Sequence, residues 1–115
     1  MDVVHFLPSL MEVLDEISDD LASVDAVFQL ELTNSQTKIY QLGIRAGKSQ
    51  WAEGVQFAAT CIIKMSVKDF SDLVQGKMNP TMALLTGRVK ILGDRKQLQK
   101  LQSILKKHYR EMPVF

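Results

Sequence analysis

The sequence predicts an α+β domain in which helices pack on one face of a five-stranded, mostly antiparallel sheet. Three observations predict this class. An amphipathic helical pattern opens the chain, period-two alternation follows it, and two short helices precede a last strand and a final amphipathic helix. The length of 115 residues corresponds to a single domain over residues 1–115.

The first helix is predicted from apolar residues at three- and four-residue spacing, which form one stripe: Leu10, Val13, Leu14, Ile17 and Leu21. Ser9 followed by Glu12 has the spacing of a capping box, and a helix that begins earlier, near Asp2, is the alternative. The acidic residues of this segment lie on the other face and are expected to be solvated.

Alternation then predicts a hairpin of two strands joined by a turn at residues 34–37. Its inward face would carry Ala26, Phe28, Leu30, Leu32, Tyr40, Leu42, Ile44 and Ala46, while the opposite face is expected to be wet. A weaker third strand is centred on Trp51 and is followed by a loop over residues 53–59. The fourth strand would turn Cys61, Ile63 and Met65 inward.

Capping residues mark the next elements. Ser66 with Asp69 opens a short helix that Gly76 ends, and Asn79-Pro80 opens a second one that ends at Gly87. A fifth strand is predicted over residues 88–92. Asp94 then caps a final amphipathic helix with an apolar face formed by Leu98, Leu101, Ile104 and Leu105.

Composition excludes several classes of protein. No apolar run approaches the roughly 20 residues of a membrane span, and the first ten residues lack the pattern of a secretory signal. The single cysteine, Cys61, cannot form an internal disulfide, which fits a reducing compartment. We therefore expect a cytoplasmic protein.

Charge is distributed unevenly along the chain. Residues 1–37 carry eight acidic side chains and no Lys or Arg, whereas residues 88–115 carry eight basic and two acidic side chains. The first interpretation is that the two ends lie close together, or that both are simply solvated. The second is that the basic C-terminal helix docks on an anionic membrane or on an acidic partner. A nucleic-acid partner is not expected, since the basic residues lack interleaved aromatics.

Residues that could support catalysis, metal binding or cofactor binding are sparse. Residues 43–49 look like a phosphate-binding loop, but three residues instead of four separate the glycines. His5 and His108 lie at opposite ends of the chain, and no ligand cluster for a metal is visible. Cys61 lies on an inward strand face, where an inert thiol is expected. The sequence thus predicts no catalytic residue, no metal and no cofactor.

The segment from Asp69 to Asp94 resembles the signature of the lipid-binding domain of the sterol carrier protein type-2 family. Positions in register include Asp69-Phe70, Gly76-Lys77, Asn79-Pro80, Gly87 and Gly93-Asp94. The resemblance implies an apolar tunnel between the sheet and the helices. The corresponding lipid-binding walls would be Phe70, Val74, Met78, Met82, Leu85, Leu101 and Leu105. Many relatives have Gln at the positions of Thr81 and Thr86, so the group that meets the polar end of the ligand is left open.

The function implied by this resemblance is non-enzymatic binding and transfer, or presentation, of a long-chain lipid such as a fatty acid, a fatty acyl-CoA or a sterol-like molecule. One alternative is an accessory module with a closed cavity, acting on an enzyme of lipid metabolism or on a membrane complex. The other is an enzyme subunit that works with a separate catalytic chain, because the family's fold also occurs as a terminal domain of enzymes. From the sequence alone, core filling is the favoured explanation of the six methionines. The resemblance instead favours a pocket for varied apolar ligands at Met78 and Met82. Val114-Phe115 would plug the tunnel mouth or form a free end.

Overall fold

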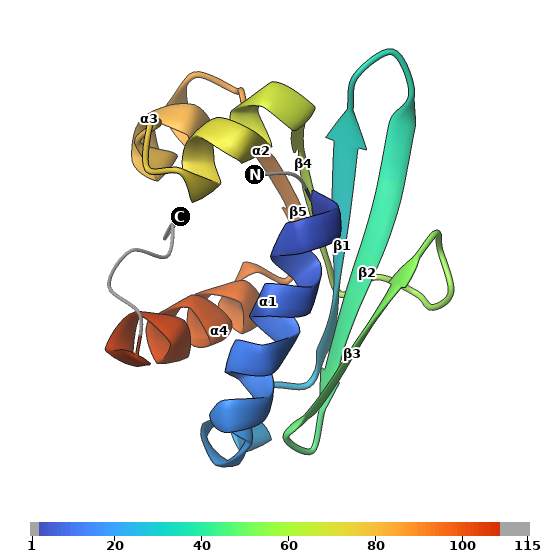
Figure 1. Cartoon of the computed structure of the whole chain (residues 1–115), viewed down its shortest axis with the longest axis vertical. Coiled ribbons are helices and arrows are strands. Elements are labelled where there is room, and N and C mark those ends of the chain that lie inside the picture. Colours follow the sequence, from blue (N-terminus) through green and yellow to red (C-terminus); the bar gives the residue numbers. More distant parts are fainter. Residues whose placement is uncertain (1–2, 109–115) are drawn as a thin grey trace.

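The computed structural model describes residues 3–108 and confirms the order of helices and strands predicted from the sequence. The helices lie together on one side of the sheet, which leaves the other side without helical cover (Figure 1). The elements are α1 (Val3–Glu16), the 3-10 helix η1 (Ser18–Ser23), β1 (Ala26–Thr33), β2 (Thr37–Arg45), β3 (Lys48–Glu53), β4 (Cys61–Ser66), α2 (Val67–Val74), α3 (Pro80–Leu85), β5 (Lys90–Gly93) and α4 (Arg95–His108).

The five strands form one sheet in the order β3-β2-β1-β4-β5. The pairs β1–β2, β2–β3 and β4–β5 are antiparallel, and the central pair β1–β4 is parallel. The chain therefore crosses from the edge strand β3 to the far side of β1 through residues 54–60. The predicted sheet, mostly antiparallel with helices on one face, is confirmed.

Side-chain caps fix the start of the helices that follow β4. The backbone N–H of Asp69 donates to Ser66 Oγ at 2.9 Å, and that of Met82 donates to Asn79 Oδ1 at 3.2 Å. Pro80 occupies the first turn of α3, where its missing N–H leaves no bond unmade. These caps were predicted from the sequence, and they orient α2 back across the sheet directly from the end of β4.

Three local predictions were wrong. The capping box at Ser9 does not start the first helix. The described part of α1 begins at Val3, in agreement with the alternative start near Asp2, and Ser9 lies within the helix, where its Oγ donates to the His5 carbonyl at 3.1 Å. Ala46 does not lie on the inward face of β2, because it sits in the tight turn to β3 with a φ of 52°. The last strand begins at Lys90, two positions later than predicted.

The side of the sheet opposite the helices was expected to be wet, and this is also wrong at its centre. Gln29 and Gln41 are buried there beneath the loop over residues 54–60. Gln41 Nε2 donates to Gln29 Oε1 and to the Phe57 carbonyl, both at 2.8 Å. Gln41 Oε1 accepts from the backbone N–H groups of Gln56 (2.9 Å) and Phe57 (3.1 Å). One side chain thus holds the crossover loop on the sheet.

Replacing Gln41 by Ala is therefore expected to destabilise the fold. The substitution leaves two loop N–H groups and one carbonyl without their partner, which should cost about 2–3 kcal/mol of unfolding free energy. Urea denaturation measures this directly. Gln50→Ala is the control, since Gln50 lies on the same side of the sheet but is exposed. Equal losses in the two variants would contradict the clamping role of Gln41.

The acidic and basic ends of the chain meet where α4 passes η1. His108 Nε2 lies 2.8 Å from Asp20 Oδ2, and Lys100 Nζ donates to the Ser23 carbonyl at 3.4 Å. This arrangement supports the first of the two readings of the charge asymmetry. Both contacts are exposed and contribute little stability. Lys106 and Lys107, in the last turn of α4, remain exposed.

The core divides into two clusters. The first cluster joins the end of α1, η1 and α4 to the sheet, and its buried members are Leu14, Ile17, Leu21, Val24, Ala26, Phe28, Leu42, Ile44, Cys61, Leu98, Leu101 and Leu105. The second cluster joins the start of α1, α2 and α3 to the other end of the sheet, through Leu7, Leu32, Tyr40, Met65, Phe70, Leu73, Ala83 and Val89.

Candidate functional site

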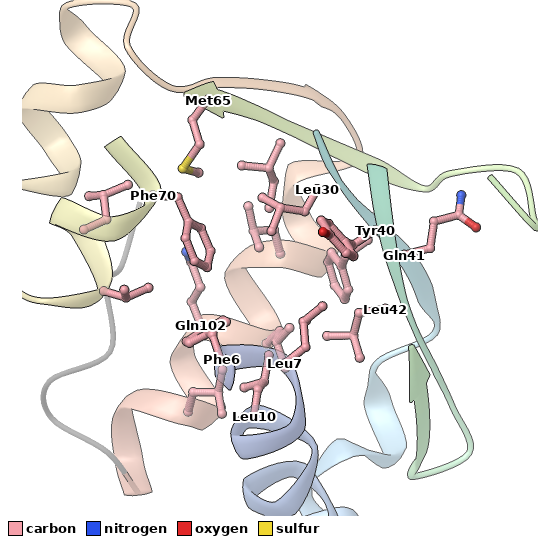
Figure 2. Close-up of a pocket in the computed structure, with 17 residues that line it drawn as sticks. Phe6, Leu7, Leu10, Leu30, Tyr40, Gln41, Leu42, Met65, Phe70 and Gln102 are labelled. Carbon is pink, nitrogen blue, oxygen red and sulfur yellow. The ribbon is translucent and has the colours of Figure 1, made fainter. Parts of the chain in front are cut away.

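An apolar cavity of about 150 Å³ lies between the two core clusters, under the helices (Figure 2). Members of both clusters line it, together with half-buried residues that belong fully to neither. The lining comprises Phe6, Leu7, Leu10, Phe28, Leu30, Tyr40, Gln41, Leu42, Ile63, Met65, Phe70, Leu73, Val74, Leu98, Leu101, Gln102 and Leu105. The core is therefore divided because its centre is hollow.

The floor of the cavity is built from residues in register across three strands. Leu30 on the central strand β1 pairs with Tyr40 on β2 and with Ile63 on β4. Leu30 and Ile63 are only partly buried, although their inward neighbours Phe28 and Leu32 on β1 are buried. An inward residue on a central strand retains accessible surface only where nothing packs above it. Leu30 thus marks the middle of the cavity floor.

Three helices form the roof. The first turns of α1 contribute Phe6, Leu7 and Leu10, α2 contributes Phe70, Leu73 and Val74, and α4 contributes Leu98, Leu101 and Leu105. Phe6 and Phe70 meet edge to face, with ring centroids 5.2 Å apart and planes at 84°, which ties α1 to α2 across the cavity. Access to the cavity therefore depends on how these three helices pack against one another.

The lining is mostly apolar and, among the described residues, carries no Asp, Glu, His, Lys or Arg. Gln102 is buried, and its side chain extends along the cavity beside the Phe70 ring (Figure 2). The Gln41 side chain points away from the cavity, toward the loop that it holds (Figure 2). A space of this size lined by Leu, Ile and Phe accepts benzene-sized apolar molecules. The site is suited to hydrocarbon and offers no partner to an ion.

Four of the seven residues predicted to form lipid-binding walls line this cavity, namely Phe70, Val74, Leu101 and Leu105. Met78 is half-buried and packs against the second cluster without lining the cavity. Met82 and Leu85 are 52% and 75% exposed on the outer side of α3. The physical reason is that α3 packs on the second cluster through Ala83 and Leu84, which leaves Met82 and Leu85 on the side that faces solvent.

Sequence reasoning missed the contributions of α1 and of the sheet. Leu30, Tyr40, Ile63 and Met65 were predicted to point inward, but their alternation does not tell which inward positions remain uncovered. Phe6 and Leu7 were missed because the helical stripe was taken to begin at Leu10. Phe6 and Leu7 lie four and three residues before Leu10, and this helical spacing was the available signal.

The remaining candidate residues are the possible metal ligands and the thiol of Cys61. Within residues 3–108, no three His, Cys, Asp or Glu side chains are grouped so that they could hold a metal ion. Burial, with the Asp94 carboxylate nearby, raises the pKa of the Cys61 thiol, so it stays protonated and unreactive. None of the helices described here has the length and apolar character needed to cross a membrane.

Comparisons with known proteins agree with this fold. A sterol carrier protein 2-like protein from Aedes aegypti, solved as its palmitated form, superposes with a TM-score of 0.72 at 20% identity, over 90% of this chain and 95% of that one. Sterol carrier protein 2 from Yarrowia lipolytica in its apo form gives 0.63 at 23% identity, over 86% and 78%.

A hydroxysteroid dehydrogenase-like protein 2 from Bos taurus is 32% identical over 96 residues, which cover 81% of this chain. The match covers only 23% of the bovine protein, so this chain corresponds to a small part of it. The model of the SCP-2 sterol transfer family matches residues 9–106, which include every helix and strand from the middle of α1 to the last turn of α4. The chain belongs to the SCP-2 sterol transfer family.

Proposed function

We propose that this protein is a non-enzymatic carrier that binds one long-chain lipid in the cavity under its helices and transfers or presents it. The observation that carries this proposal is the hollow centre of the core, walled by Leu, Phe, Ile, Val and Met side chains. Filling such a hole with side chains would stabilise the fold, because every unfilled cavity forfeits packing contacts. A cavity retained at that cost is explained by a ligand.

Burial of hydrocarbon would drive binding. Each methylene group that leaves water contributes about 0.8 kcal/mol, part of which is offset by ordering of the lipid and by its lost translational freedom. Contacts of this kind discriminate weakly between an acyl chain and a sterol-like molecule. Phe70, Val74, Leu101 and Leu105 would contact the ligand, as the family resemblance implied, together with Leu30 and Ile63 from the floor. The relative described as palmitated supports an acyl chain as one ligand.

A long-chain lipid is larger than the benzene-sized molecules that a 150 Å³ cavity accepts. Binding would therefore widen the cavity, and the helical roof is the part able to yield, because the floor is fixed by the hydrogen bonds of three paired strands. The roof is held by apolar and ring contacts such as Phe6–Phe70. Separation of α1 from α2 would open the space from above without disturbing the sheet.

The second candidate is an accessory module in which the cavity stays closed. Two observations favour it: the described cavity is smaller than a long lipid, and the bovine relative carries the corresponding region as a minor part of a dehydrogenase-like protein. In that case the module would act by contact with an enzyme or a membrane complex, and its cavity would be a packing defect.

A vesicle assay tests the carrier function. Donor vesicles containing a pyrene-labelled fatty acid are mixed with acceptor vesicles, and transfer is followed with and without the protein. The carrier proposal predicts that catalytic amounts of protein accelerate transfer. It also predicts a further acceleration with anionic acceptors, through the exposed Lys106 and Lys107 on α4, that salt removes. Transfer at the protein-free rate in both kinds of vesicle would favour the accessory module.

A further inference from the structure

The cavity contains one polar group without an evident structural purpose, the hydroxyl of Tyr40. This side chain is 5% exposed and belongs to the second core cluster, with its ring 6.4 Å from that of Trp51. Among residues 3–108, no backbone or side-chain group forms a hydrogen bond with the Tyr40 hydroxyl. Among the described residues, the fully buried side-chain oxygen without a partner is Ser49 Oγ, so the Tyr40 hydroxyl keeps some accessible surface. Tyrosine hydroxyls inside proteins usually find a partner.

The hydroxyl points into the cavity. Figure 2 shows the Tyr40 oxygen on the cavity side of the ring, next to Leu30 on the floor. Strand register fixes this position, since Tyr40 and Leu30 are direct partners in the β1–β2 pair. Phenylalanine would supply the same ring and the same packing. Among the described residues, the hydroxyl oxygen therefore adds nothing to the packing that the ring alone would not supply. It lies where a bound molecule would lie.

We propose that Tyr40 hydrogen-bonds to an uncharged oxygen of the bound lipid, so that the preferred ligands carry a hydroxyl, ketone or ester group inside the cavity. This inference rests on the carrier function proposed above and narrows the class of ligand. The oxygen must be uncharged because the lining contains no Lys, Arg or His, and a carboxylate or phosphate buried there would lack a counter-charge. A fatty acid would keep its carboxylate outside, in water.

The test uses three ring compounds of similar size that fit a benzene-sized space: phenol, toluene and benzoate. Dissociation constants are measured by NMR titration of the full chain and of its Tyr40→Phe variant at neutral pH. Loss of one hydrogen bond should weaken phenol binding about 2- to 12-fold in the variant. Toluene affinity should be the same in both proteins, and benzoate should bind to neither.

The variant is expected to fold, because Tyr40→Phe removes no hydrogen bond that the described residues make, and thermal unfolding checks this. A second readout does not depend on the variant. In the wild-type protein, phenol should shift the 13C resonance of the Tyr40 carbon that bears the hydroxyl, and toluene should not.

The outcomes separate this inference from the carrier function. If toluene and phenol both bind and Tyr40→Phe affects them equally or not at all, the role of Tyr40 is wrong and the carrier function stands. Benzoate binding as tight as phenol binding would overturn the requirement for an uncharged oxygen. If no compound binds to the wild-type protein, both the carrier function and the role of Tyr40 are overturned.

Discussion

Replacing Leu30 by Trp should remove lipid binding and leave the fold intact. Leu30 lies at the centre of the cavity floor and retains accessible surface there, so the indole would occupy space that is now empty. Because the added ring fills a hole, the change in unfolding free energy should stay within about 1.5 kcal/mol. A lipid would have to displace the indole, so its dissociation constant should rise about tenfold or more, which corresponds to at least about 1.4 kcal/mol.

Leu85→Trp is the matched control, since Leu85 carries the same side chain at an exposed position on α3 outside the cavity. It should bind lipid as the wild-type protein does. Isothermal titration with palmitate, with urea denaturation alongside, measures both effects. Equal lipid affinities in the two tryptophan variants would show that the cavity is not the binding site.

The largest loss of stability from a single methyl group is expected for Gly93→Ala. Gly93 ends β5 with a φ of 90°, a backbone conformation that side chains other than hydrogen disfavour. A Cβ atom there would also meet the backbone carbonyl oxygen of Thr60, the same oxygen that accepts the Asp94 N–H at 2.9 Å. Backbone strain and the collision together should cost about 3 kcal/mol of unfolding free energy.

Gly87→Ala separates the two causes. Gly87 has a similar φ of 76°, but nothing lies within 4 Å of the position that its Cβ would occupy. This variant should lose only about 1 kcal/mol, the cost of the backbone conformation itself. Chemical denaturation of both variants provides the comparison. Equal losses of unfolding free energy in the two variants would mean that the end of β5 adjusts freely and that Thr60 does not constrain it.

The fold was predictable because its signals are local. Helix caps such as Ser66 and Asn79 act within three residues, and alternation assigns inward and outward faces within a single strand. The errors arose where a distant segment decides the environment. Gln41 looked like a solvent-facing residue by alternation, and only the crossover loop, fifteen and sixteen positions later in the sequence, buries it.

The site was predictable only in part, for the same reason. Hydrophobicity marks residues that avoid water, but it does not say which of them pack and which enclose space. Phe70 and Leu101, which the resemblance pointed to, line the cavity, whereas Leu85, which it also pointed to, faces solvent. The cavity exists because α1, α2 and α4 meet above Leu30 without filling the space, and this depends on how three helices far apart in the sequence pack together.

Native mass spectrometry of the full chain as purified from cells, followed by organic extraction, tests the carrier function most directly. The cavity predicts a 1:1 complex with a lipid whose extracted mass identifies it, and reconstitution of the stripped protein with palmitate or a sterol should restore one bound molecule. The Leu30→Trp variant should carry none. A wild-type protein that is free of lipid as purified and also refuses both added lipids would contradict the carrier function.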